Sequence, residues 1–386
     1  MHCYDRQSVI KKMTNTPGPG SFTHCFTSLK DPRRINKGNI RHSLNEILFV
    51  SISAVISGCV GIESIQLFGE QHLDWLRTYF PYKRGAPSHD TLGRVFANLD
   101  VIEFNKCFIN WVESISDLCH GRVIALDGKT ICGAASTAAL GSKLHIVSAF
   151  CNKNNLSVGQ LTVAEKSNEI TAIPQLLDLI AVQGCIVTID AMGCQKDIAK
   201  KIIDKNADYI LQVKDNQKGL REQIEDTFKT LPVETANTEL DMGHGRIEQR
   251  KCEIISNLEL IDQLPYWKNL QSVVRISAEI TEKKSGLTTC NTRYYISSLA
   301  SNAKLLNNSV RSHWGIENKL HWTLDVVMKE DNRLARKDNL PENLNIIKKI
   351  AIGFLNQEKT FMKSKPLKMQ KAYGNDEYRE LLLKIF

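Results

Sequence analysis

The sequence predicts an α/β protein whose core is a mixed sheet and whose N-terminal part consists only of helices. Three observations lead to this expectation. Apolar residues recur at helical spacing up to about residue 119, and short apolar runs of strand type begin after Gly121. The first runs are joined by a short turn, as in a hairpin, whereas later runs alternate with helical patterns. That order places antiparallel and parallel neighbours in one sheet, with helices on both faces.

The N-terminal part begins with residues 1–30, which are polar and rich in turn residues, and which we expect to form a disordered arm. Residues 31–119 are expected to form a helical domain. Its first apolar helix begins after Ser43, because Ser43 and Glu46 match the capping-box pattern. Three further helices are predicted over residues 62–79, 88–99 and 101–119, the second with Ser88 as its N-cap.

The core is predicted from strand and helix patterns in the middle of the chain. Strands are expected over residues 123–126, 144–150, 156–163, 185–189 and 209–213, with helices over residues 169–182 and 195–205. Residues 215–300 depart from this alternation and are predicted to be a β-rich insertion, with strands at residues 246–255, 272–281 and 288–297. Helical patterns return over residues 311–328 and 342–356.

The positive charge of the chain is concentrated near its C-terminus. The formal net charge is +8, and residues 301–386 hold 16 Lys and Arg against 10 Asp and Glu. The lysine-rich block from Lys348 to Lys371 has an irregular, Pro-interrupted end, which predicts a mobile segment that contacts DNA phosphates; residues 361–386 are expected to form a basic tail. A solvated basic helix face would give the same composition.

Cysteine spacing and hydropathy argue against a cysteine-bound zinc site and against a membrane-spanning helix. The eleven cysteines form no Cys-x-x-Cys pair and no zinc-type spacing, so reduced thiols are expected. The most apolar stretch, residues 44–60, contains Glu46 and several serines, and therefore predicts a buried helix rather than a membrane span. We expect a soluble, cytoplasmic protein with no membrane partner and no organic cofactor.

Two aspartates follow strand-type runs directly. Asp127 comes after residues 123–126, and Asp190 comes after residues 185–189. If these strands are neighbours, both carboxylates emerge at one sheet edge, and a divalent cation would relieve their repulsion. The alternative is that each aspartate caps a turn, since Asp127-Gly128 is a typical turn dipeptide.

A third acid would strengthen the case for a metal site. The C-terminal helical block offers four candidates: Glu317, Asp325, Glu330 and Asp331. Glu317 lies between Trp314 and His321 at helical spacing, so the three side chains would share one face. Any single acid of this block could equally be a solvated charge on a surface helix.

Five motifs occur in order along the chain, at residues 126–130 (Leu-Asp-Gly-Lys-Thr), 188–192 (Thr-Ile-Asp-Ala-Met), 209–217 (Tyr-Ile-Leu-Gln-Val-Lys-Asp-Asn-Gln), 244–248 (His-Gly-Arg-Ile-Glu) and 313–317 (His-Trp-Gly-Ile-Glu). Together they resemble the H-repeat-associated transposases, a bacterial branch of the DDE transposases. The resemblance covers about residues 28–360. Each motif alone is weak, whereas five in order at matching spacing are specific.

The resemblance implies a ribonuclease H-like catalytic core made of residues 120–214 and 301–360, interrupted by the β-rich insertion. It assigns Asp127, Asp190 and Glu317 as the catalytic and metal-binding triad. The implied cofactor is a pair of Mg²⁺ ions, for which Mn²⁺ can substitute, and the implied reaction is in-line cleavage and strand transfer of double-stranded DNA. We expect at least a homodimer, because two DNA ends must be paired.

The sequence departs from the resemblance around the last acid. Related transposases carry a Tyr-x-x-Arg-x-x-x-Glu pattern followed by Lys, and this chain has Val310, His313 and Leu324 at the Tyr, Arg and Lys places. The identity of the cation that contacts the DNA is therefore left open, and the candidates are Lys214, Arg311 and Lys319. Genes of this type also include remnants of elements that no longer move.

Further DNA contacts are expected from the helix that begins at Ser88, which with Thr91 and Arg94 is compatible with helix-turn-helix docking. Lys348 and Lys349 are expected to contribute phosphate contacts. A plain helical bundle is the alternative for the Ser88 helix. Two other functions stay open at this point: a ribonuclease H-like nuclease that only hydrolyses, and a DNA-binding regulator with an inactive core.

Overall fold

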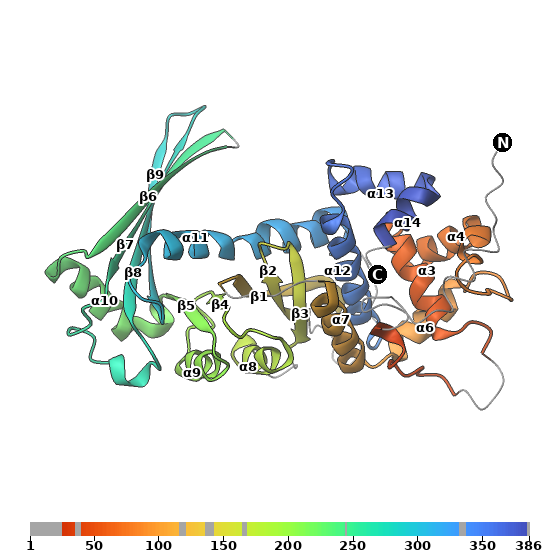
Figure 1. Cartoon of the computed structure of the whole chain (residues 1–386), viewed down its shortest axis with the longest axis horizontal. Coiled ribbons are helices and arrows are strands. Elements are labelled where there is room, and N and C mark those ends of the chain that lie inside the picture. Colours follow the sequence, from red (N-terminus) through yellow and green to blue (C-terminus); the bar gives the residue numbers. More distant parts are fainter. Residues whose placement is uncertain are drawn as a thin grey trace.

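The computed structural model describes residues 25–34, 40–115, 121–135, 143–163, 168–243, 245–331 and 337–383. N-terminal helices gather at one end of the molecule, a sheet flanked by helices occupies the middle, and long strands project from the other end (Figure 1). Residues 1–24 of the expected disordered arm lie outside the described residues. The end of that arm is packed, because Cys25, Phe26 and Leu29 are buried.

The N-terminal region is entirely helical, as predicted. Its helices are α3 (Leu44–Ile56), α4 (Ile62–Gln71), α5 (Leu73–Leu76), α6 (His89–Asn98) and α7 (Val101–Ile115). The capping box is confirmed, because Ser43 Oγ accepts from the Glu46 amide at 3.1 Å and the Glu46 carboxylate accepts from the Ser43 amide at 2.7 Å. The predicted helix over residues 62–79 is instead broken at His72 into α4 and the one-turn α5.

A nine-stranded mixed sheet forms the body of the protein. The strands are β1 (Val123–Ala135), β2 (Lys143–Cys151), β3 (Leu156–Thr162), β4 (Ile186–Ile189), β5 (Asp208–Val213), β6 (Thr235–Gly243), β7 (Arg246–Ile255), β8 (Ser272–Glu282) and β9 (Thr288–Ser297). Their order is β3-β2-β1-β4-β5-β9-β8-β7-β6. β1 and β2 are antiparallel, as are β2 and β3, whereas β1, β4 and β5 are parallel. The first five strands therefore have the ribonuclease H-like arrangement.

The first strand is longer than predicted. It continues beyond Leu126, because Asp127, Gly128 and Thr130 pair with Ser148, Val147 and His145 of β2. The alternative in which Asp127-Gly128 forms a turn is wrong. Asp127 lies within a strand, and its backbone pairs with Ser148 of β2.

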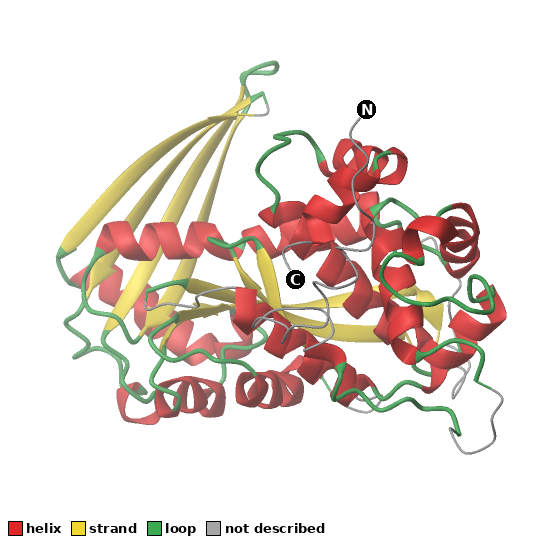
Figure 2. Cartoon of the chain, turned by 45° about the vertical axis from the view of Figure 1, so that its right-hand side comes forward, coloured by secondary structure: helices red, strands yellow, loops and turns green. Residues whose placement is uncertain are grey.

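The β-rich region extends the sheet rather than standing apart from it. β9 pairs antiparallel with β5, and β8, β7 and β6 follow outward as the long projecting strands seen in Figure 2. The three predicted strands of this region are present. The sequence prediction missed β6 and the helix α10 (Lys218–Thr230), which precedes it.

Helices cover both faces of the core (Figure 1). α8 (Glu169–Leu179) and α9 (Lys196–Asp204) lie on one face, and α11 (Ala303–His313) crosses the other, contacting β1, β4 and β5. The helical pattern predicted over residues 311–328 is present, but it is not α-helical throughout. α11 ends at His313, and π-helical turns follow at Ile316–His321 and Thr323–Val327.

The long helix α12 (Leu340–Gln357) joins the core to the N-terminal helices, because it contacts α3, α6, α7 and β3. Its Lys348 and Lys349 are only 5% and 2% exposed. Lys348 pairs with the buried Glu330 at 3.2 Å, and Lys349 donates to Ser148 Oγ at 2.7 Å. Burial lowers the pKa of Lys349 to about 7. The prediction that these two lysines contact DNA phosphates is therefore wrong.

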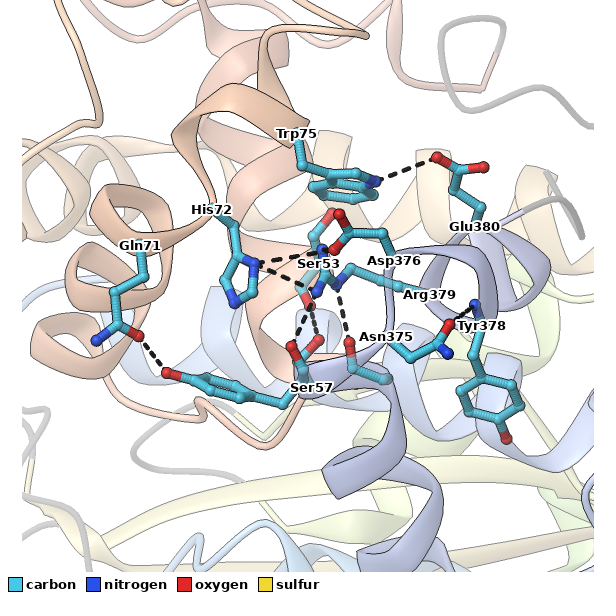
Figure 3. A network of polar contacts seen from close by, with 12 residues as sticks. Ser53, Ser57, Gln71, His72, Trp75, Asn375, Asp376, Tyr378, Arg379 and Glu380 are labelled. Atoms are coloured by element: carbon cyan, nitrogen blue, oxygen red, sulfur yellow. Dashed lines mark hydrogen bonds and ion pairs between the residues drawn. The ribbon is translucent and has the colours of Figure 1, made fainter. Parts of the chain in front are cut away.

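The C-terminal tail is folded, which corrects the prediction of a mobile basic segment. It forms α13 (Lys365–Gly374) and α14 (Asp376–Leu383), both of which contact α3. Lys368 is buried and pairs with Glu358 at 3.0 Å. Figure 3 shows the contact region, in which Arg379 lies beside Trp75 and His72. No helix in the described part of the chain is long and apolar enough to cross a membrane.

Candidate active site

The sheet brings the two predicted aspartates to neighbouring positions. β1 and β4 are parallel and pair Leu126 with Ile189, so Asp127 and Asp190 are the next residues on adjacent strands. Glu317 lies in the π-helical turn that follows α11. All three acids line one pocket of about 100 Å³, together with Lys214, His313 and Trp314. The structure thus brings together the three acids that the resemblance singled out.

The pKa values of the three acids show that negative charges are crowded together in the pocket. Burial, together with the charges of Asp190, Glu317 and Glu169, raises the pKa of Asp127 to about 7. Burial and Glu169 also raise the pKa of Asp190, although the amides of Gly193 and Met192 donate to its carboxylate. Burial raises the pKa of Glu317 as well. Each shift means that the free protein disfavours holding all these carboxylates charged at once.

A divalent cation fits the donor chemistry of this pocket, because carboxylate oxygens are the hard ligands that Mg²⁺ and Mn²⁺ accept. Among the residues that the structure describes, no three His, Cys, Asp or Glu side chains are gathered closely enough to form a ready metal cluster. Binding of a cation would therefore draw the carboxylates together, and the raised pKa of Asp127 indicates the repulsion that the cation would relieve.

Two neutral histidines border the acids. His321 Nδ1 lies 3.5 Å from Asp127 Oδ2, and burial lowers the pKa of His321 to about 3. His313 shares a hydrogen bond of 3.0 Å with the Thr188 hydroxyl on β4, and burial lowers its pKa to about 4. Both rings are uncharged at neutral pH, so they shape the pocket without adding positive charge.

Sequence reasoning missed a fourth acid beside the pocket. Glu169 opens α8, and its carboxylate is 2.7 Å from His145 Nε2, while His145 Nδ1 is 2.8 Å from the Thr130 hydroxyl. A Cβ atom on Gly128 would come within 2.1 Å of Glu169 Oε1, so only glycine allows this approach. An acid in the first turn of a helix is commonplace, and for that reason the sequence carried no signal for Glu169.

The other three candidate acids surround a lysine instead of the pocket. Lys129 Nζ lies 2.7 Å from Asp325, 3.4 Å from Glu330 and 3.6 Å from Asp331. None of these three acids is among the residues that line the carboxylate pocket. This arrangement leaves Glu317 as the acid of the C-terminal block that faces Asp127 and Asp190.

The predicted cations occupy different places. Lys214 lines the carboxylate pocket. Arg311 lines the cavity next to it and is paired with Asp241 at 2.6 Å and Glu248 at 3.3 Å. Lys319 is exposed and is not among the residues lining the pocket.

A second concave surface lies in the helical domain. Ser88 caps α6, as predicted, by accepting from the Thr91 amide at 3.3 Å. Ser88, Thr91 and Arg94 line a cavity of about 680 Å³. The same cavity contains four further cations: Arg33, Arg34, Arg41 and Lys337. We call this surface the α6 cavity.

The comparisons with known proteins place the chain in a family. Residues 119–354 match the family described as "Transposase DDE domain", and residues 23–112 match "DDE_Tnp_1-associated". The chain is 40% identical over 348 residues to "H repeat-associated putative transposase YhhI" of Escherichia coli K12, covering 88% of this chain and 92% of that protein. It is 39% identical over 355 residues to "Putative transposase YncI" of Escherichia coli O157:H7, covering 90% of each.

A solved structure is also similar over most of the chain. The piggyBac transposase synaptic complex with hairpin DNA covers 99% of this chain and 82% of its own, at 12% identity and a TM-score of 0.46.

The chain belongs to the DDE transposase family, a class of polynucleotidyl transferases. Within that family it is of the H repeat-associated type, and the resemblance inferred from its five motifs is confirmed.

Proposed function

We propose that this transposase cleaves double-stranded DNA at the ends of an insertion element and joins the freed ends to target DNA, using Asp127, Asp190 and Glu317. The observation that carries the proposal is the meeting of three acids from β1, β4 and the π-helical turn around one pocket. The raised pKa values of all three support it, because such shifts cluster at functional sites.

The proposed mechanism assigns a role to each side chain. The three carboxylates would hold the divalent cations, proposed to be two Mg²⁺ ions. When bound, such cations activate the attacking oxygen and stabilise the leaving 3′ oxygen. His321, whose Nδ1 is 3.5 Å from Asp127 Oδ2, would help to orient the Asp127 carboxylate, and Lys214 would offset charge near Asp190 and Glu317. No Ser, Tyr or Cys nucleophile is needed, because the attacking group is water or a DNA 3′-OH.

We further propose that the α6 cavity binds duplex DNA and that two copies act together to pair two ends. Five cations around one concavity favour phosphate contacts. Arg33 is engaged with Asp31 at 2.6 Å, which leaves Arg34, Arg41, Arg94 and Lys337 as the cations offered to DNA. A dimer on DNA would give each end its own carboxylate pocket.

A strand-joining reaction tests the proposal against its alternatives. The protein is incubated with Mg²⁺, supercoiled plasmid and a labelled duplex that carries the DNA flanking the gene and ends in a free 3′-OH. Label joined to plasmid is the expected result. Plasmid nicking without joined label would instead identify a hydrolytic nuclease, and binding without either product would identify a regulator. Either of these outcomes contradicts the proposal.

A further inference from the structure

Two cavities flank the carboxylate pocket, and both are rich in cations. The first, of about 280 Å³, is lined by four arginines: Arg246, Arg250, Arg293 and Arg311. The second, of about 270 Å³, is lined by Lys214, Arg221 and Arg293. The first shares Trp314 with the carboxylate pocket, and the second shares Lys214 with it. Arg293 lines both cavities and therefore lies where they meet beside the acids.

Most of these arginines are already neutralised by carboxylates. Arg250 is paired with Glu239 and Glu248, and Arg221 with Asp215 and Glu225. Arg311 is paired with Asp241 and Glu248, as described above. In the part of the chain that the structure describes, no carboxylate lies within ion-pairing distance of the Arg293 guanidinium, which lies instead over an aromatic ring. Burial raises the pKa of Glu317 and the Arg293 charge lowers it in part, so Arg293 directs positive charge toward the carboxylate pocket without forming an ion pair within the described residues.

The position of Arg293 is fixed by the elements around it. It lies on β9 opposite Ile276 of β8, and its guanidinium carbon is 4.8 Å from the centroid of the Trp314 ring. Trp314 ends α11 and precedes Glu317 by three residues. Successive residues of a strand alternate between its two faces, so Arg293 shares a face with Tyr295, which lines the carboxylate pocket. A stacked guanidinium keeps its planar fork of donors at its edge, where Arg293 also hydrogen-bonds with Tyr295.

We infer that Arg293, held against Trp314, contacts a phosphate of the DNA strand beside the bond that is cleaved. This inference rests on the proposed function. Guanidinium binds phosphate through two parallel hydrogen bonds, which fixes orientation as well as charge. The role suits this chain in particular, because Val310, His313 and Leu324 supply no cation at the places where related transposases carry a Tyr, Arg and Lys.

The test compares Arg293→Gln with Arg275→Gln. Arg275 is a matched control: it lies on the neighbouring strand β8, is 4.6 Å from the Phe228 ring centroid, and pairs with Glu253 at 2.8 Å, away from both cavities. Binding of a labelled duplex of arbitrary sequence is measured in EDTA over a range of salt. Nicking of supercoiled plasmid is measured in Mg²⁺, and thermal unfolding shows that each variant is folded.

Arg293→Gln is expected to slow nicking by about 10²-fold or more, as loss of one preorganised donor does in other phosphate and oxyanion sites. It should also flatten the slope of log affinity against log salt by about one. Arg293→Lys is expected to restore the slope, and only part of the rate, because it keeps the charge without the fork. Arg275→Gln should nick and bind as the wild type does.

Equal nicking and equal salt slopes for Arg293→Gln and Arg275→Gln would overturn the inference. The proposed function fails in a different way, through persistence of nicking in Glu317→Gln. A folded Arg293→Gln that is fully active, alongside an inactive Glu317→Gln, would therefore remove Arg293 from the DNA contact while leaving the carboxylate site intact.

Discussion

The Asp127 carboxyl is surrounded by other acidic side chains. Its backbone pairs with Ser148 of β2, and its carboxyl is buried next to Asp190, Glu317 and Glu169. The pKa of about 7 means that the metal-free protein holds a proton on this carboxyl more tightly than the unfolded chain does, whose reference value is 3.8. The folded state therefore gains stability from Asp127 at acidic pH and loses it as the pH rises through about 7.

Asp127→Asn should consequently stabilise the metal-free protein at about pH 8, by up to about 4 kcal/mol, since asparagine resembles the protonated acid at every pH. The gain should shrink to about 1 kcal/mol at about pH 4 to 5, because the wild-type carboxyl is then protonated in the folded state but still partly ionised in the unfolded chain. Urea unfolding in EDTA at the two pH values measures the difference.

Asp204→Asn is the control for this experiment. The Asp204 carboxylate accepts from Lys268 Nζ at 2.6 Å, and this hydrogen bond lowers the pKa of Asp204. Its substitution should give no gain in stability at about pH 8. A gain from Asp127→Asn that is the same at both pH values would contradict the assigned cause of the shift.

At the residue scale, the sequence identified the acids that follow apolar strands but not the groups that approach them from elsewhere. Asp127 and Asp190 could be predicted because an apolar run followed directly by an acid is visible as a local pattern. Glu169, His145 and Arg293 could not, because their roles depend on close approach between α8, β2, β9 and the π-helical turn. Such contacts between distant segments produce no periodic pattern in the amino-acid sequence.

At the element scale, the C-terminal helices stabilise the N-terminal helical domain. Arg379 of α14 is fully buried, lies 4.3 Å from the Trp75 ring centroid, and donates to the carbonyls of Ala372 and Tyr373 at 3.0 Å each (Figure 3). It also pairs with Asp376 at 2.9 Å. The Trp75 indole donates to Glu380 at 3.2 Å, so α5 and α14 are joined by two polar contacts.

Arg379→Ala should lower the free energy of unfolding by about 3–5 kcal/mol, because it leaves buried carbonyls and a carboxylate without their donor. Urea unfolding measures the loss. Arg77→Ala is the comparison, since Arg77 forms only an exposed pair with Asp74 at 3.5 Å, which contributes less than about 1 kcal/mol. Similar losses in both variants would show that α14 does not anchor the domain.

Elements with strong local patterns were predicted with small errors at their ends, as α3, β7 and β9 show. β6 was missed because its alternating polar residues leave much of both faces exposed, as befits an edge strand. The pairing of β9 with β5 could not be predicted from the sequence, because it joins strands about 80 residues apart. The basic C-terminal block was misjudged because composition does not reveal which lysines find buried partners.

At the scale of the whole molecule, the proposed function assigns DNA binding and DNA cleavage to two separate surfaces. The α6 cavity lies in the helical domain, and the carboxylate pocket lies at the sheet, with α12 packed between the two regions. Binding and cleavage should therefore respond to different substitutions.

Arg94→Ala is expected to weaken binding to the terminal DNA that flanks the gene and to reduce discrimination against scrambled DNA, with little effect on unfolding, because Arg94 is exposed. Competition binding at fixed salt measures the effect. Arg84→Ala removes an exposed arginine of the same domain outside the α6 cavity and should change neither quantity. Equal affinities of Arg94→Ala and Arg84→Ala for both DNAs would exclude α6 from recognition.

The central claim is that the carboxylate pocket performs the cleavage, and a comparison of Glu317→Gln with Asp325→Asn tests it most directly. Both acids lie in the π-helical stretch, but Glu317 lines the pocket with Asp127 and Asp190, whereas Asp325 pairs with Lys129 at 2.7 Å. Plasmid nicking in Mg²⁺ is measured alongside DNA binding and thermal unfolding. We predict that Glu317→Gln abolishes nicking while it still folds and binds DNA, and that Asp325→Asn keeps nicking. Nicking that persists in Glu317→Gln and disappears in a folded Asp325→Asn would contradict the claim.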